Sequence, residues 1–135
     1  MAEHKSAEQK DDVLEELFVD RATVLDQSVL KDMLKDRIQL TKEGSVMPLP
    51  QFHTLKRDQR VLLALLAQKV IKIKLGGEEK LTPGAIVAIT GMPKGTVAPT
   101  VRDLERDGYI RSEKGAYWVP DSLLYKAQQI LTPHK

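Results

Sequence analysis

The chain has 135 residues, of which 41% are hydrophobic and 30% are charged, and it contains no cysteine. This length fits one domain, or one domain with an appendage, and the lack of cysteine excludes disulfides, thiolate zinc sites and cysteine nucleophiles. Residues 1–12 are polar and no stretch approaches the ~18 apolar residues of a membrane span, so neither a signal peptide nor a transmembrane helix is predicted. We therefore expect a cytoplasmic protein that does not contact a membrane.

The two parts of the chain differ in charge, although the net charge is only +2. Residues 1–54 hold 7 Lys and Arg against 11 Asp and Glu, whereas residues 55–135 hold 14 against 8. A basic half is typical of a surface that meets phosphates, but the solvated faces of stable helices give the same excess. The charge pattern therefore supports nucleic-acid binding without establishing it.

The N-terminal part of the chain is predicted to be a tail followed by helices. Residues 1–9 are polar and have nothing to bury, which predicts a disordered tail. Residues 10–54 are predicted to be a helical appendage and a connector. Apolar residues at helical spacing begin at Val13 and, after a polar patch, resume at Val24. The pattern indicates one long helix or two helices that meet near Thr23, and the capping preference of threonine favours two.

Four carboxylates share one side of the first predicted helix, namely those of Asp11, Asp12, Glu15 and Glu16. Acids on an exposed helix face are usually solvated, and the sequence places no histidine or further carboxylate to complete a metal site. His53, in the connector, has neither an acid pair nor a nucleophile nearby and is given no role. We expect no metal ion and no cofactor.

The connector and the next helix are read from their periodicity. Residues 38–49 alternate with period two around a glycine-containing turn, which predicts a small hairpin, although Pro48 and Pro50 confine its second half to an edge strand or an extended loop. A long helix is predicted over residues 54–75, ended by the glycines at 76 and 77. Its apolar face is expected to consist of Val61, Leu62, Leu65, Leu66, Val70 and Ile73.

Two shorter helices follow. Thr82 as N-cap and Pro83 as first residue predict a helix to about Ile89, which Gly91 and Pro93 end. Leu81 is expected to add a short strand beside the hairpin further along the chain.

The second of these helices has an apolar repeat at spacings of four and three, formed by Val97, Val101 and Leu104. Pro99, Arg102 and Arg106 fall on the opposite face. A proline deep inside a helix removes a hydrogen bond, so we expect Thr96 to be the N-cap, with Pro99 in the first turn. If the helix instead starts at Lys94, a bend is expected at the proline.

The end of the chain is predicted to be a hairpin and a helix. After Gly108, residues 109–112 and 116–119 are rich in aromatic and β-branched residues and flank a glycine-containing turn, which predicts two short strands. A last helix is expected within residues 120–135, capped by Asp121 or Ser122. Its apolar face is expected to consist of Leu123, Leu124, Ala127, Ile130 and Leu131.

The amphipathic stretches over residues 10–40 and 121–131 favour self-association. The chain has few aromatic residues that could pack on the apolar faces of these stretches. A partner chain is therefore expected to bury them. This predicts a homodimer that forms through both stretches.

The segment TGMPKGTVAPTVRDLERDGYI, followed by RSEKGAYWV, resembles the winged helix-turn-helix domain of prokaryotic transcription regulators. In that family a T-V-x-x-x-(V/L)-x-x-L-x-x-x-G-x-(I/L) pattern marks the recognition helix and the start of the wing. The resemblance covers residues 55–119 and is best at residues 94–97. It implies a mainly α fold with a small β-hairpin, to which the helical appendage and the C-terminal helix are added. It also implies a transcription regulator that binds double-stranded DNA, and with the dimer expected from the apolar stretches this predicts a small homodimeric regulator.

Contacts with DNA are expected from the second helix of this unit, because the first residues of such a helix reach base edges in the major groove. The expected contacts are Lys94, Gly95, Thr96, Ala98, Thr100, Arg102 and Arg106 on the helix, and Arg111 and Lys114 on the hairpin. Three acids share that helix, and pairs of Arg102 with Glu105 and of Asp103 with Arg106 are expected to engage some of its charge. One copy would therefore bind weakly, whereas two copies on one duplex would roughly double the salt dependence.

Other functions are weaker readings of the same residues. No glycine-rich phosphate loop and no Ser-His-acid set is present, so the chain is not expected to be an enzyme. The runner-up is a protein-interaction module that docks partners through Tyr117, Trp118 and their hairpin, although a small domain is expected to bury its only tryptophan. RNA binding ranks third, because the aromatic residues of a stacking surface are missing.

Overall fold

A computed structural model of the protein describes residues 27–132, and the structural statements below concern this part of the chain. The expected tail, the four acids of the first predicted helix and the helix junction near Thr23 lie outside the described residues. The helices are α4 (Gln27–Leu34), α5 (Arg57–Leu75), α6 (Pro83–Thr90), α7 (Lys94–Arg106) and α8 (Leu124–Leu131), with 3-10 helices at Pro50–Thr54 and Asp121–Leu123. The strands are β1 (Ile38–Leu40), β2 (Val46–Pro48), β3 (Arg111–Glu113) and β4 (Ala116–Trp118). The fold is mainly helical with two small antiparallel hairpins, as the sequence predicts.

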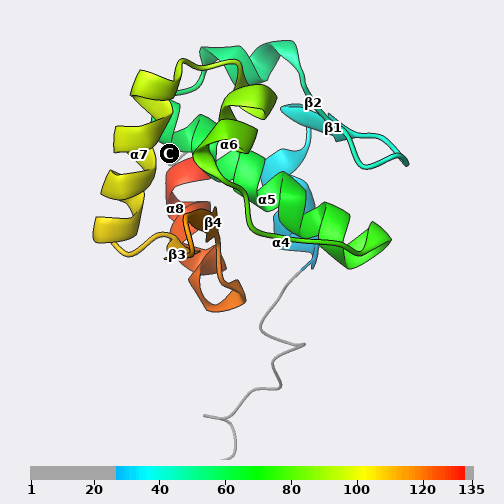
Figure 1. The fold of residues 1–135 in the computed structure, drawn as a ribbon. Helices are drawn as coiled ribbons and strands as arrows, with labels where there is room; N and C mark the ends of the chain where they lie inside the picture. The colour runs from blue at the N-terminus through cyan, green and yellow to red at the C-terminus, as the bar shows by residue number, and fades with distance from the viewer. Residues whose placement is uncertain (1–26, 133–135) are drawn as a thin grey trace, which may run out of the picture.

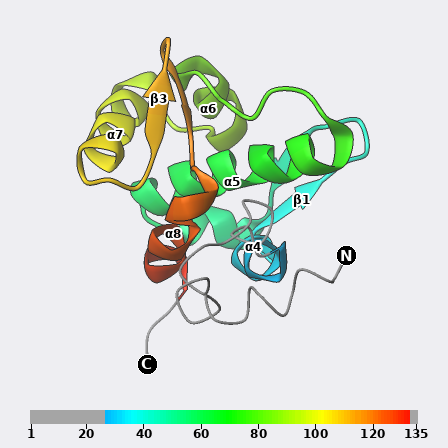
Figure 2. The ribbon, with the colours of Figure 1, turned by 90° about the horizontal axis from the view of Figure 1, so that it is seen from below.

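Helix α5 is the centre of the fold. Figure 2 shows α6 and α7 on one side of it and α4 and α8 on the other, and α5 contacts all four helices. Every residue from Val61 to Ala67 is fully buried. A helix that is apolar on all sides is stable only when other elements pack around it, and the four neighbouring helices do so here. One continuous apolar core therefore reaches from Leu30 on α4 to Leu131 on α8.

The boundaries of α5 differ from the predicted ones at one end. Residues 50–54 form a separate 3-10 helix that buries Phe52, so α5 begins at Arg57, with Lys56 as its N-cap. At the other end the helix stops at Gly76, as predicted. Ile73 was expected in the apolar face but is 37% exposed, because the last turns of α5 extend beyond the helices that cover its middle (Figure 2).

The caps of α6 are confirmed. The Thr82 side chain accepts a hydrogen bond from the Ala85 amide, Pro83 occupies the first turn, and Gly91 closes the helix in the left-handed conformation. Glycine adopts this conformation without the steric cost that a Cβ atom imposes, which explains its place at the end of the helix.

The predicted start of α7 is wrong. The helix begins at Lys94 and not after Thr96, because Pro93 is the N-cap and its carbonyl accepts the amides of Thr96 and Val97 at 2.9 and 3.0 Å. Pro99 therefore lies inside the helix and leaves the Gly95 carbonyl without its helical amide donor. The bend expected for this start stays a prediction.

The end of α7 is closed by a motif that directs the chain into the second hairpin. The Gly108 amide donates to the Glu105 carbonyl and the Tyr109 amide to the Leu104 carbonyl, at 3.0 and 2.9 Å. This pair of bonds, with Gly108 at a φ of 84°, is a Schellman motif. Lys126 of α8 also contacts this segment, because its Nζ lies 4.7 Å from the centre of the Tyr109 ring.

Both hairpins form where periodicity predicts them. In the first, Gln39 of β1 pairs with Met47 of β2. In the second, β3 and β4 are joined by Lys114 and Gly115, which both have positive φ, as a type I′ turn requires. Leu81 pairs with Tyr117 through two backbone hydrogen bonds and so extends the second hairpin by the predicted short strand.

The last helix is covered within its own chain. Leu124, Ala127 and Leu131 of α8 are buried in the same core as Leu30 and Met33 of α4. The expected cap at Asp121 or Ser122 is wrong, because these residues form a 3-10 turn and α8 begins at Leu124. The argument for a dimer from uncovered stripes therefore fails for the described parts of both stretches, and the remainder, residues 10–26, lies outside the described residues.

Candidate nucleic-acid interface

The nine residues predicted to contact DNA differ in how far they are exposed to solvent. The exposed residues are Lys94, Gly95, Arg102, Arg106, Arg111 and Lys114, and the half-buried ones are Thr96 and Ala98. Thr100 does not belong to the outward face, because it is only 6% exposed and its hydroxyl donates to the Thr96 carbonyl at 2.6 Å. Eight of the nine predicted contacts are therefore at least partly exposed on α7 and the adjoining hairpin, and Thr100 is not.

The two arginines of α7 have different surroundings. Arg106 lies 3.0 Å from an oxygen of Asp103, as expected, and 3.3 Å from an oxygen of Asp107. Arg102 forms no ion pair within residues 27–132. Its expected partner Glu105 instead accepts a hydrogen bond from the Ser112 hydroxyl at 2.6 Å. The charge of Arg102 is therefore uncompensated by its neighbours, whereas that of Arg106 is shared with two carboxylates.

The bond between Glu105 and Ser112 fixes the second hairpin against α7. Figures 1 and 2 both show β3 beside the C-terminal half of α7. Arg111 and Glu113 alternate with Ser112 along β3, so the Arg111 side chain lies on the face of the hairpin opposite to Ser112, and Lys114 lies in the turn.

Lys80 contacts one residue in each strand of the second hairpin. Its Nζ lies 3.1 Å from a carboxylate oxygen of Glu113 and 5.1 Å from the centre of the Trp118 ring. The hydrogen bond to Glu113 raises the pKa of Lys80 above its ordinary value. In turn, the backbone amide of Lys80 donates to the Glu78 carboxylate, and this bond is the main cause that lowers the pKa of Glu78. Trp118 is half-buried, so the expectation of a fully buried tryptophan is not met.

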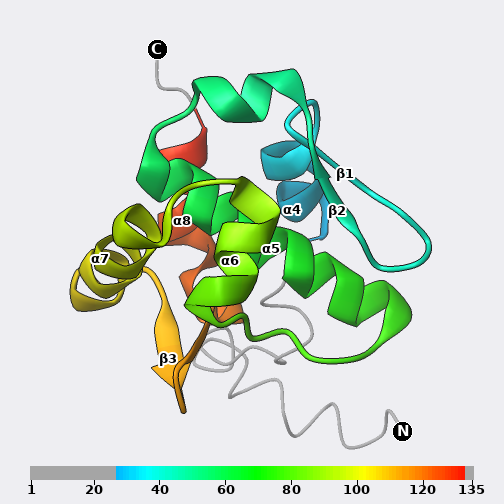
Figure 3. The same ribbon diagram turned by 45° about the horizontal axis from the view of Figure 1, so that its top comes forward.

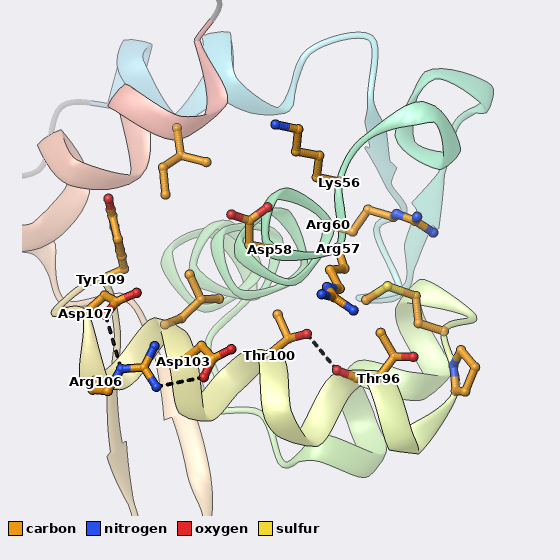
Figure 4. A pocket seen from close by; sticks show the side chains of 14 residues that line it. Lys56, Arg57, Asp58, Arg60, Thr96, Thr100, Asp103, Arg106, Asp107 and Tyr109 are labelled. Atoms are coloured by element: carbon orange, nitrogen blue, oxygen red, sulfur yellow. Dashed lines mark hydrogen bonds and ion pairs between the residues drawn. The ribbon is translucent and has the colours of Figure 1, made fainter.

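A groove of about 910 Å³ runs along the side of α7 that faces the start of α5 (Figure 4). Four basic and three acidic side chains line it, together with apolar residues that include Met92 and Leu104. Lys56 and Arg57 form part of its α5 wall, and Thr96 is part of its α7 wall (Figure 4). Sequence reasoning missed these two cations. The basic pair is visible in the sequence, but only the packing of α5 on α7 places Arg57 beside the helix, whereas the Lys56 side chain extends away from α7 (Figure 4).

Comparisons with protein-family models, with curated proteins and with solved structures found no match. Within residues 27–132 no group of three or more His, Asp or Glu side chains could hold a metal ion. None of the described helices has the length and apolar character needed to cross a bilayer.

Proposed function

We propose that residues 55–119 are a winged helix-turn-helix that binds double-stranded DNA, with α7 entering the major groove and the β3–β4 hairpin as the wing. One observation carries this proposal. Lys94 and Arg102 on α7, with Arg111 and Lys114 on the hairpin, are exposed, and none of the four forms an ion pair with another residue of the described chain. Four uncompensated cations on adjoining elements suit a row of phosphates.

The shape of the outward face supports the same reading. Gly95 has no side chain and Ala98 has a small one, so the first turns of α7 can approach base edges closely. Arg102 lies one turn further along and can reach a guanine or a phosphate. Arg106 contributes less, because two carboxylates share its charge.

The proposal includes a small homodimeric transcription regulator acting in the cytoplasm of a prokaryotic cell. Paired duplex contacts would offset the weak binding that the acids of α7 impose on one copy. Because the apolar faces of the described parts of the two predicted stretches pack in the core of the monomer, we base the proposed dimer on the apolar repeat in the sequence of residues 10–26. Sedimentation equilibrium tests this point, and a monomer at all concentrations would exclude the dimer while leaving the DNA proposal intact.

The first test is binding of the full chain to a random-sequence duplex of about 30 base pairs, measured by fluorescence anisotropy at several salt concentrations. We expect an affinity that falls steeply with salt, because phosphate contacts release counterions. Replacement of both Lys94 and Arg102 by alanine is expected to lower the affinity and the salt slope. A variant with alanine at Lys31 and Lys35, which lie on the far side of α5, is the control of equal charge. Absence of binding at low salt would overturn the proposal.

A protein-interaction module is the second candidate, and the partial exposure of Tyr117 and Trp118 favours it. Trp118 is the only tryptophan in the chain, so its fluorescence reports on this surface alone. If the module docks a partner through this surface, acrylamide should quench the emission of the free protein efficiently. Weak quenching with a blue-shifted emission would count against an exposed docking patch.

A further inference from the structure

The cations of the groove beside α7 are not equally engaged. Lys56 and Arg57 are exposed and form no ion pair with any residue between 27 and 132. Arg60, one turn further into α5, is half-buried and donates through Nε to the Leu55 carbonyl at 3.0 Å. The charges of Lys56 and Arg57 are therefore available to a ligand.

Each acid of the groove has a hydrogen-bond or ion-pair partner other than Lys56 and Arg57. Asp58 accepts a hydrogen bond from the Gln59 amide at 2.8 Å, which directs one of its oxygens to the helix backbone. Asp103 and Asp107 are both paired with Arg106. The four basic and three acidic side chains of the groove leave it a net charge of +1, and the two cations Lys56 and Arg57 form no ion pair among the described residues.

The position of this pair relative to α7 determines what it could bind. At 100° per residue, Ala98 and Glu105 lie on the flank of α7 that faces the hairpin, and Thr96 and Asp103 lie on the opposite flank, which faces the groove. Arg102 lies between the two flanks. Figure 3 shows the same arrangement, with the start of α5 and strand β3 on different sides of α7.

We propose that Lys56 and Arg57 bind backbone phosphates of the duplex that α7 enters, on the side of α7 away from the hairpin. This inference rests on the proposed DNA binding and adds to it a second phosphate contact. The major groove is about 12 Å wide and a helix with its side chains is about 10 to 12 Å across, so the helix lies between two phosphate backbones. The hairpin, with Arg111 and Lys114, lies on the side of one of these backbones, and the start of α5, with Lys56 and Arg57, lies on the side of the other.

The test compares the full-length protein with a variant carrying Lys56→Gln and Arg57→Gln. Glutamine keeps much of the length of both side chains and is a good helix former, so the start of α5 is preserved. Binding to the random-sequence duplex is measured between about 50 and 200 mM salt. Each phosphate contact contributes about 0.9 to the slope of log K against log salt, so the double variant is expected to lose about 1.8.

Two controls separate this contact from a general effect of charge. The Lys31→Gln, Lys35→Gln variant removes the same charge from α4 and the residue that follows it, and is expected to keep the wild-type slope. Arg57→Lys keeps the charge in the groove and is also expected to keep it. Far-UV circular dichroism and the melting temperature are measured for each variant to confirm equal folding.

The outcomes distinguish the two proposals. A steep wild-type slope that the Lys56→Gln, Arg57→Gln variant leaves unchanged would overturn this inference and leave the DNA proposal standing. Equal losses in this variant and in the Lys31→Gln, Lys35→Gln control would also overturn it, because the effect would then be one of net charge. If the wild-type protein does not bind the duplex at low salt, both proposals fail together.

Discussion

The Nζ atom of Lys69 lies 2.6 Å from a carboxylate oxygen of Asp121, although the two residues are 52 positions apart, and it lies equally close to Glu79. The Lys69 side chain is only 3% exposed, whereas Glu79 and Asp121 are 13% and 32% exposed. This cluster joins the middle of α5 to the loop before α6 and to the turn before α8. It therefore ties the C-terminal helix to the unit that carries the candidate interface.

Replacement of Lys69 by methionine is expected to destabilise the protein by about 3 kcal/mol. Removing one partner of a buried ion pair costs roughly 3 to 5 kcal/mol, and the partial exposure of Asp121 places the loss at the lower end. Urea unfolding measures it. Lys72→Met is the matched control on the same helix, since Lys72 is 53% exposed and lies 3.9 Å from Glu79; it should cost less than about 0.5 kcal/mol. Similar losses for both variants would contradict a structural role of the buried cluster.

Replacement of Pro99 by alanine is expected to stabilise the protein by about 1 to 3 kcal/mol. The new amide can donate to the Gly95 carbonyl, and alanine is the better helix former. Gly95→Ala is a useful comparison, because a Cβ atom there would meet nothing within 4 Å. It should add only about 0.5 to 1 kcal/mol. Thermal unfolding provides the measurement, and a lower melting temperature for Pro99→Ala would show that the proline relieves a strain in α7.

The pKa of Glu78 is expected below its ordinary value of 4.5 in the folded protein. A lowered folded pKa means that the carboxylate stabilises the fold above pH 4.5 and that this contribution is lost as the pH falls through the folded pKa. An NMR pH titration measures it. The main cause is the amide of Lys80, so the Lys80→Met variant should keep most of the shift. Loss of the whole shift would assign it instead to the charge of the Lys80 side chain.

Arg102 and Arg106 are expected to contribute unequally to DNA binding, if the proposed function is correct. Arg102→Ala should lower the salt slope by about 0.9, because its charge has no partner within residues 27–132. Arg106→Ala should lower it less, since Asp103 and Asp107 share its charge. The two single variants form a matched pair on one helix. Equal slopes for both variants and the wild type would show that the outward face of α7 does not meet phosphates.

The elements that could be predicted are those defined by local signals. Thr82, Pro83 and Gly91 specify both ends of α6 within a short stretch, and the structure confirms them. The start of α7 was missed because two local signals compete. Thr96 is a good capping residue, but the Pro93 carbonyl accepts the first amides and the helix starts earlier.

The candidate interface was predictable only in part. The cations of α7 follow from helical periodicity, whereas Thr100 was assigned to the wrong face. Its angular position lies next to Val97 and Leu104, so it joins the buried side once α5 packs there. Lys56 and Arg57 could not be assigned from the sequence, because the place of the start of α5 beside α7 depends on the packing of two helices that are distant along the chain.

The core that extends from Leu30 to Leu131 has a consequence for biosynthesis. A ribosome delivers α8 after the other described helices, so the apolar middle of α5 lacks one of its neighbouring helices until that part of the chain has been made. Domains fold as units, and incomplete chains that expose apolar surface are prone to aggregate. We therefore expect nascent chains that stop before residue 124 to depend on chaperones, and release of the last helix to coincide with acquisition of protease resistance.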